Sequence, residues 1–118
     1  MQDDQTYEQR VAATRLRFIA GLSERLDNID IALAAGEDDT SAERHSRTIH
    51  RMLHDLAGNA AMLELDAVAR SIREGVAIAE AADTQGEALS SASILRIHEV
   101  VAGTRTLEAC KRKHISEV

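Results

Sequence analysis

The chain has 118 residues, which is close to the commonest size of one domain and too few for two domains with separate cores. It contains no proline and only two aromatic side chains, so its composition suits helices and disfavours sheets. Twenty acidic residues against fourteen basic ones leave a net charge of −6, which repels nucleic acid and anionic membranes. We therefore expect one all-α domain over residues 1–118 that binds neither nucleic acid nor membranes.

The expected compartment and cofactor content follow from features that the sequence lacks. The only cysteine, Cys110, has no partner for an internal disulfide, and residues 1–10 contain no apolar stretch of the secretory type, so a cytoplasmic protein is expected. The chain contains no P-loop, no GxGxxG and no cysteine pair of the zinc-binding type. We expect no cofactor of its own, and any phosphate chemistry must take its nucleotide from another molecule.

The first helix is predicted from about residue 6 to residue 35, where apolar residues recur at the helical intervals of three and four. The buried stripe consists of Phe18, Leu22, Leu26, Ile29 and Leu33. The prediction allows an interruption near Gly21 and Ser23, where helix propensity falls and a cap is available. Gly36 ends the helix as the residue after its C-cap.

Two further helices follow after short polar segments. Thr40 and Glu43 form a predicted capping box that begins the second helix. Its buried stripe consists of Ile49, Leu53, Leu56, Ala60 and Leu63. The third helix is predicted to begin at Asp66 as N-cap and to end in the polar segment 83–86. It buries Val68, Ile72, Val76 and Ala79.

The fourth helix is predicted to begin at Ser90 or Ser91 and to end in the basic segment 111–113, which favours a helix C-terminus. Its stripe consists of Ile94, Ile97, Val101, Thr104 and Leu107. Four amphipathic helices joined by short turns predict an antiparallel up-and-down four-helix bundle. A monomer is expected, because turn signals recur roughly every twenty to thirty residues and prevent a long coiled coil.

One histidine in the second predicted helix lies outside the buried stripe. His54 follows Leu53 by one residue, about 100° around the helix, and is therefore expected to point to solvent. The same face carries Arg47, His50, Arg51, Ala57, Gly58 and Ala61.

Gly58 needs an explanation, because glycine costs about 1 kcal/mol in a helix interior relative to alanine. In a functional explanation, a side chain at position 58 would crowd the imidazole of His54, whereas a bare backbone leaves its ring nitrogen open to a phosphoryl group. In a structural explanation, another helix packs closely on Gly58. Spacing alone does not decide between the two explanations.

The segment around His54 resembles the signature of histidine-containing phosphotransfer (HPt) domains, which reads roughly His-x-Leu-Lys-Gly-Ser-Ala. Residues 54–60 read His-Asp-Leu-Ala-Gly-Asn-Ala and share the histidine, leucine, glycine and final small residue. The resemblance covers about residues 15–82, and the fourth helix fits by position only. It implies that His54 is the phosphoacceptor and favours the functional explanation of Gly58.

Three positions depart from the family pattern. The usual lysine is Ala57, the usual serine is Asn59, and Glu64 stands where many members have glycine. Arg47 or Arg51 could supply the positive charge of the missing lysine.

Neighbouring polar groups could also contribute to the site. His50, one turn before His54, could frame it or hydrogen-bond a phosphate oxygen, and the amide of Asn59 could act as a donor. His50 and His54 lack a third ligand, so no metal site is expected.

Members of this family take a phosphoryl group from the phospho-aspartate of a receiver domain and pass it to another receiver, without hydrolysing a nucleotide. A neutral imidazole is a competent nucleophile near pH 7 because the ordinary pKa of histidine is about 6.5. The resemblance therefore implies a phosphorelay intermediate without ATP-dependent kinase activity of its own. Expected partners are response-regulator receiver domains, which carry Mg²⁺, and a hybrid histidine kinase. The docking surface around His54 consists of Arg47, His50, Arg51, Asp55, Ala57, Gly58, Asn59 and Ala61.

Two alternatives stay open. An acidic residue directly after the histidine, here Asp55, also occurs in the dimerisation helices of sensor histidine kinases, where two helices from each subunit form the bundle. The other alternative is a helical adaptor or inhibitor that binds receivers without accepting phosphate, in which Ala57 marks a degenerate site. Binding of a receiver without phosphate transfer would indicate the adaptor. A dimer whose bundle takes two helices from each chain would indicate the kinase-like module.

Overall fold

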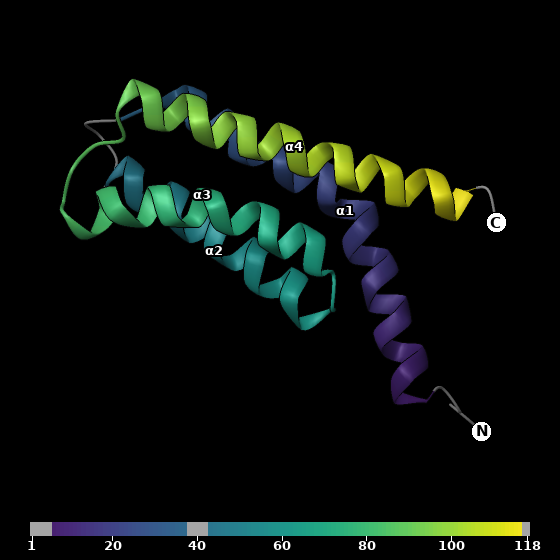
Figure 1. Ribbon diagram of the computed structural model, residues 1–118. Helices are drawn as coiled ribbons and strands as arrows, with labels where there is room; N and C mark the ends of the chain where they lie inside the picture. Colours follow the sequence, from purple (N-terminus) through teal and green to yellow (C-terminus); the bar gives the residue numbers. More distant parts are fainter. Residues whose placement is uncertain (1–5, 38–42, 117–118) are drawn as a thin grey trace.

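The computed structural model describes residues 6–37 and 43–116, with side chains described as far as residue 107. These residues form four helices and no strand (Figure 1). The helices are α1 (Tyr7–Ala35), α2 (His45–Met62), α3 (Asp66–Thr84) and α4 (Ser91–Ser116). The all-α prediction is therefore confirmed for the described part of the chain.

One hydrophobic cluster draws side chains from all four of these helices. Its fully buried large members include Leu22, Leu26, Ile29, Ile49, Leu53, Leu56, Val68, Ile72, Ile97 and Val101. Contact is most extensive between α2 and α3, continues from α3 to α4 and from α4 to α1, and is sparsest between α1 and α2. In Figure 1, α1 lies beside α4, and α2 lies beside α3. The helices thus pack as a four-helix bundle.

The predicted stripes form most of this core. Some of their members are only half-buried, because they lie at the margins of the helix contacts: Phe18, Leu63, Val76, Ile94 and Leu107. Among the described residues, no helix combines the length and the apolar character that a bilayer crossing requires.

Helix α1 begins at the predicted residue. The Gln9 amide donates to Thr6 Oγ1 at 3.1 Å, and the Thr6 amide donates to Gln9 Oε1 at 2.8 Å, which together form a capping box. Gly36 follows the last residue with a φ of 68°, as expected at this end. The interruption near Gly21 and Ser23 does not occur, because the buried side chains on both sides of these residues carry one helix through them. The purple N-terminal part of α1 diverges from the other helices (Figure 1).

Helix α2 begins at His45, later than the capping box predicted. Thr40 lies outside the described residues, and Glu43 and Arg44 precede the helix. The start of α2 is instead fastened to the end of α1: the His45 ring Nε2 donates to the Ala32 carbonyl at 2.8 Å. Tertiary packing therefore determines this boundary.

Helices α2 and α3 end in the same type of turn. The Leu65 amide donates to the Ala60 carbonyl, and the Glu64 amide donates to the Ala61 carbonyl, which is the Schellman arrangement. Glu64 occupies the left-handed position with a φ of 61°. At the end of α3 the corresponding position is Gly86, with a φ of 70°.

The start of α3 differs from the prediction by one residue, whereas the start of α4 agrees with it. The N-cap of α3 is Leu65 rather than Asp66, which lies inside the first turn, because the tight turn after α2 leads directly into the helix. The predicted cap of α4 is confirmed at Ser90, whose Oγ accepts from the Ser93 amide at 3.1 Å.

Candidate functional site

His54 lies in the middle of α2 and is exposed, as its position one residue after Leu53 predicts. Its ring makes no hydrogen bond to another described residue, and its one ring contact is with His50. Both ring nitrogens are therefore available to an incoming group. An exposed imidazole without a bonded partner has the arrangement that a nucleophile needs when the electrophile arrives on another protein.

His50 lies one turn before His54 and is held by α3. The Asp83 Oδ2 atom lies 2.9 Å from His50 Nδ1, and Asp83 Oδ1 lies 3.2 Å from Arg47 Nε. The hydrogen bond from His50 and the neighbouring Arg47 hold the pKa of Asp83 below its ordinary value, against the opposing effect of burial. Asp83 is therefore a carboxylate that accepts from both residues.

The second nitrogen of His50 has no partner. Its Nε2 atom is buried and makes no hydrogen bond to a described residue. The His50 and His54 ring centroids lie 6.0 Å apart, and the ring planes meet edge to face at 83°. A buried polar atom without a partner is uncommon in native proteins and calls for an explanation.

The two arginines of the predicted docking surface are both ion-paired. Arg51 pairs with Glu43, and Thr48 Oγ1 donates to the same carboxylate at 2.6 Å. The Thr48 hydrogen bond and the Arg51 guanidinium lower the pKa of Glu43. Arg47 pairs with Asp83, yet the side chains of Arg47 and Arg51 remain 66% and 57% exposed. Their positive charge near His54 is partly neutralised in the free protein.

The structural explanation of Gly58 is wrong, and the functional one does not apply to a side chain as small as that of alanine. A Cβ atom at position 58 would meet nothing within 4 Å, so an added methyl group would not touch the His54 ring, and no helix packs on this glycine. Gly58 is exposed, as predicted. The closely packed glycine is Gly75 in α3, where a Cβ would lie 3.3 Å from Leu53 Cδ1.

Ala57 does not belong to the exposed docking surface. It is only 4% exposed and is part of the hydrophobic core, because the broad contact between α2 and α3 covers its side of α2. Ala61 is half-buried beside it.

Asp55 and Asn59 are exposed but lie toward α1, on the other side of α2 from His50. The predicted surface is therefore divided into a part beside α3 and a part beside α1.

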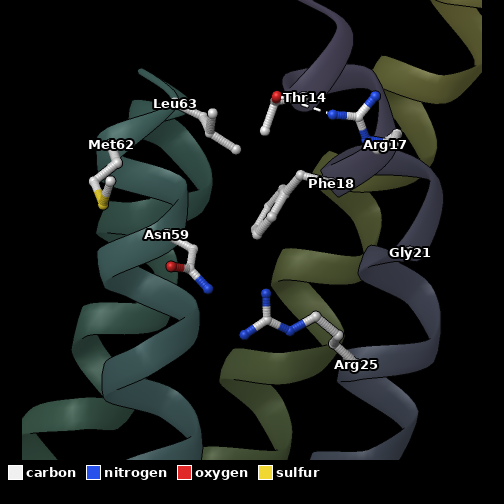
Figure 2. A pocket seen from close by; sticks show the side chains of 8 residues that line it. All are labelled: Thr14, Arg17, Phe18, Gly21, Arg25, Asn59, Met62 and Leu63. Carbon is white, nitrogen blue, oxygen red and sulfur yellow. Dashed lines mark hydrogen bonds between the residues drawn. The ribbon is translucent and has the colours of Figure 1, made fainter. Parts of the chain in front are cut away.

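The part beside α1 borders a groove that sequence reasoning missed. Where α1 and α2 diverge, they enclose a cavity of about 440 Å³, shown in Figure 2. Its lining consists of Thr14, Arg17, Phe18, Gly21, Arg25, Asn59, Met62 and Leu63. The Arg25 guanidinium lies 5.5 Å from the centre of the Phe18 ring, which is a cation–π contact. The groove exists because two distant segments splay apart, and no local sequence pattern signals such a divergence.

Sequence reasoning also missed the role of Asp83. In the sequence it marks only the end of the third helix, 33 residues after His50. Its role follows from the contact of α2 with α3, which brings Asp83 in the last turn of α3 beside Arg47 and His50 in the first turns of α2. Among the described residues, no cluster of three or more potential metal ligands occurs.

Comparison of the chain with protein-family models, with curated proteins and with solved structures finds no match. The functional argument therefore depends on the residues of the site and on their resemblance to the HPt signature.

Proposed function

We propose that this protein is a monomeric, cytoplasmic histidine phosphotransfer protein of the HPt type, built as a single antiparallel up-and-down four-helix bundle. His54 accepts a phosphoryl group from a phospho-aspartate receiver domain and passes it to another receiver. The observation that carries the proposal is the exposed His54 ring, which has no hydrogen-bond partner among the described residues, in the middle of a bundle helix within an HPt-like segment.

The reaction needs little from this chain beyond a nucleophile and a docking surface. A ring nitrogen of His54 attacks phosphorus, an N–P bond forms, and the O–P bond of the acyl phosphate breaks to release the receiver carboxylate. The other ring nitrogen releases its proton to solvent, to which the exposed ring has access. Phosphoryl transfer depends mainly on in-line positioning and charge neutralisation, which the Mg²⁺ of the receiver provides.

The turn after α2 supports the family resemblance independently of His54. Glu64 adopts a φ of 61°, in the left-handed region that favours glycine. This is the position at which many HPt domains have glycine. The backbone of this chain thus has the conformation that the family residue suits, although the residue itself differs.

The test is phosphoryl transfer from several purified, phosphorylated receivers in Mg²⁺, followed as acid-labile phosphate on the wild type, His54→Gln and His98→Gln. His98 is an exposed histidine on α4 and serves as the matched control. We expect label on the wild type and on His98→Gln and at least about a hundredfold less on His54→Gln, because the nucleophile is removed. Equal labelling of His54→Gln would refute the assignment.

The adaptor alternative is favoured by position 57, which is alanine rather than the family lysine and is buried in the core, so it presents no positive charge beside His54. Receiver binding without labelling of any variant would support the adaptor. A dimer that completes its bundle with two helices from each chain would support the kinase-like module instead.

A further inference from the structure

We propose that Asp83 and His50 form a proton-binding pair that acts on phosphorylated His54: phosphorylation makes His50 take up a proton, and its Nε2–H then donates to a phosphoryl oxygen. This inference rests on the proposed role of His54 as phosphoacceptor. His50 and Asp83 are positioning residues, and the pair takes the place of the lysine that is absent at position 57.

The hydrogen bond to Asp83 determines where the proton of neutral His50 resides. A carboxylate can only accept, so the proton lies on Nδ1, which is 2.9 Å from Asp83 Oδ2. The Nε2 atom then carries a lone pair. This is the atom that is buried and has no hydrogen-bond partner among the described residues. His50 is therefore a base whose Nδ1 is oriented by the Asp83 carboxylate and whose buried Nε2 has no hydrogen-bond partner among the described residues.

The charges that face His50 make proton uptake conditional. Asp83 faces it from α3, and Arg47 and His54 face it from α2. Asp83 stabilises an imidazolium, whereas Arg47 opposes it. In the unphosphorylated protein, a proton on Nε2 would be a buried donor without an acceptor, which is unfavourable. A phosphoryl group on His54 supplies both the missing acceptor and negative charge.

The rings of His50 and His54 are neighbours on α2. Their centroids are 6.0 Å apart, and the edge of one ring faces the plane of the other. His54 is exposed, and within the described part of the chain it makes no hydrogen bond that would have to break when its ring turns. Hydrogen bonds between a charged donor and a phosphoryl oxygen are stronger than neutral ones, so protonation and phosphorylation favour each other.

The experiment does not require a receiver. Potassium phosphoramidate phosphorylates exposed histidines: its P–N bond breaks, ammonia leaves with a proton from solvent, and a new P–N bond forms to the ring. The product is purified as the species modified on His54, and the titration of each histidine is followed by NMR of histidine-labelled protein. His98 is the internal control, because its Nδ1 also contacts a carboxylate, Asp30 Oδ1 at 3.1 Å, on another side of the bundle.

We expect the titration midpoint of His50 to rise by about one pH unit or more on phosphorylation, a tenfold or greater gain in proton affinity, and that of His98 to stay constant. The rise should persist at about 1 M salt, where the screening length is about 3 Å, since a direct hydrogen bond is screened little. Asp83→Asn, with its helix content checked by circular dichroism, should lose at least half of the rise.

An unchanged His50 midpoint, or a rise that disappears at high salt, overturns the inference. Failure of receivers to label His54 is a separate result that counts against the proposed function, and it leaves the outcome of this titration intact.

Discussion

His50 and His54 lie one turn apart on the same helix, yet their surroundings assign them different chemistry. His54 is exposed and makes no hydrogen bond to the described residues, whereas His50 is bonded to Asp83 through one nitrogen and buried at the other. A nucleophile that meets an external electrophile needs access, and a proton-binding side chain needs orientation. His50 lies closer to α3 than His54 does, and this difference in surroundings accounts for the two proposed roles.

Gly58 provides a residue-scale test of the docking surface. Since a Cβ at this position meets nothing within 4 Å, Gly58→Ala should stabilise α2, and the free energy of unfolding should rise by about 1 kcal/mol in urea denaturation. A receiver that approaches His54 across this bare backbone should meet the added methyl group, so transfer should slow by about tenfold.

The matched control is Gly103→Ala in α4, which also has open space at its Cβ. It should give a similar stabilisation without slower transfer. Unchanged transfer by Gly58→Ala would show that receivers do not approach over this glycine.

At the scale of the helix, the periodicity of α2 predicts its buried stripe correctly, but the observed buried face is wider than the predicted one. The intervals of three and four identify Ile49, Leu53, Leu56 and Ala60, all of which are buried. The contact with α3 is broad enough to cover Ala57 as well, on the side of the stripe nearer to His54. Since the width of a buried face depends on the neighbouring helix, periodicity predicts its centre and not its edges.

The turn that ends α2 carries a second prediction. Glu64 has a φ of 61°, which costs a residue with a Cβ about 1 kcal/mol, so Glu64→Gly should raise the free energy of unfolding by about that amount. Chemical denaturation followed by circular dichroism measures the change.

Gln85→Gly is the matched control, because Gln85 ends α3 with an ordinary φ of −84°. This substitution should lower stability or leave it unchanged, since glycine gains nothing there. A loss of stability in Glu64→Gly would contradict the conformational explanation of this turn.

At the scale of the whole molecule, ion pairs join helices that contact one another to different extents. Asp83 connects α3 to α2 through His50 and Arg47, and Arg105 connects α4 to Asp27 and Asp30 of α1. Contact between α1 and α2 is the sparsest, and the cavity of Figure 2 lies where they diverge. Each helix of the bundle therefore contacts two others, and the contact between α1 and α2 is the least extensive.

The lowered pKa of Asp83 predicts how stability responds to acid. A carboxyl group whose pKa is lower in the folded than in the unfolded chain contributes stability above its unfolded value, which is about 3.8 for an aspartate, and this contribution is lost as the pH falls through the folded value. The free energy of unfolding should therefore fall as the pH is lowered from about 5 to below the folded pKa of Asp83. Asp83→Asn should show a shallower fall.

Urea denaturation at a series of pH values measures this dependence. Glu80→Gln is the control, because Glu80 is an exposed carboxyl of the same helix and makes no hydrogen bond or ion pair with the residues that the structure describes. Identical acid dependence in the wild type and Asp83→Asn would contradict the contribution of this pair.

The order of the helices, the centres of their buried stripes and the exposure of His54 could be predicted from the sequence, because each depends on periodicity and end signals within one segment. The partner of His50, the burial of Ala57, the open space at Gly58 and the cavity beside Asn59 could not. These features depend on which helices touch and how far their contact extends. Residues separated by tens of positions decide them together, so only the packed bundle determines the surroundings of the candidate phosphoacceptor.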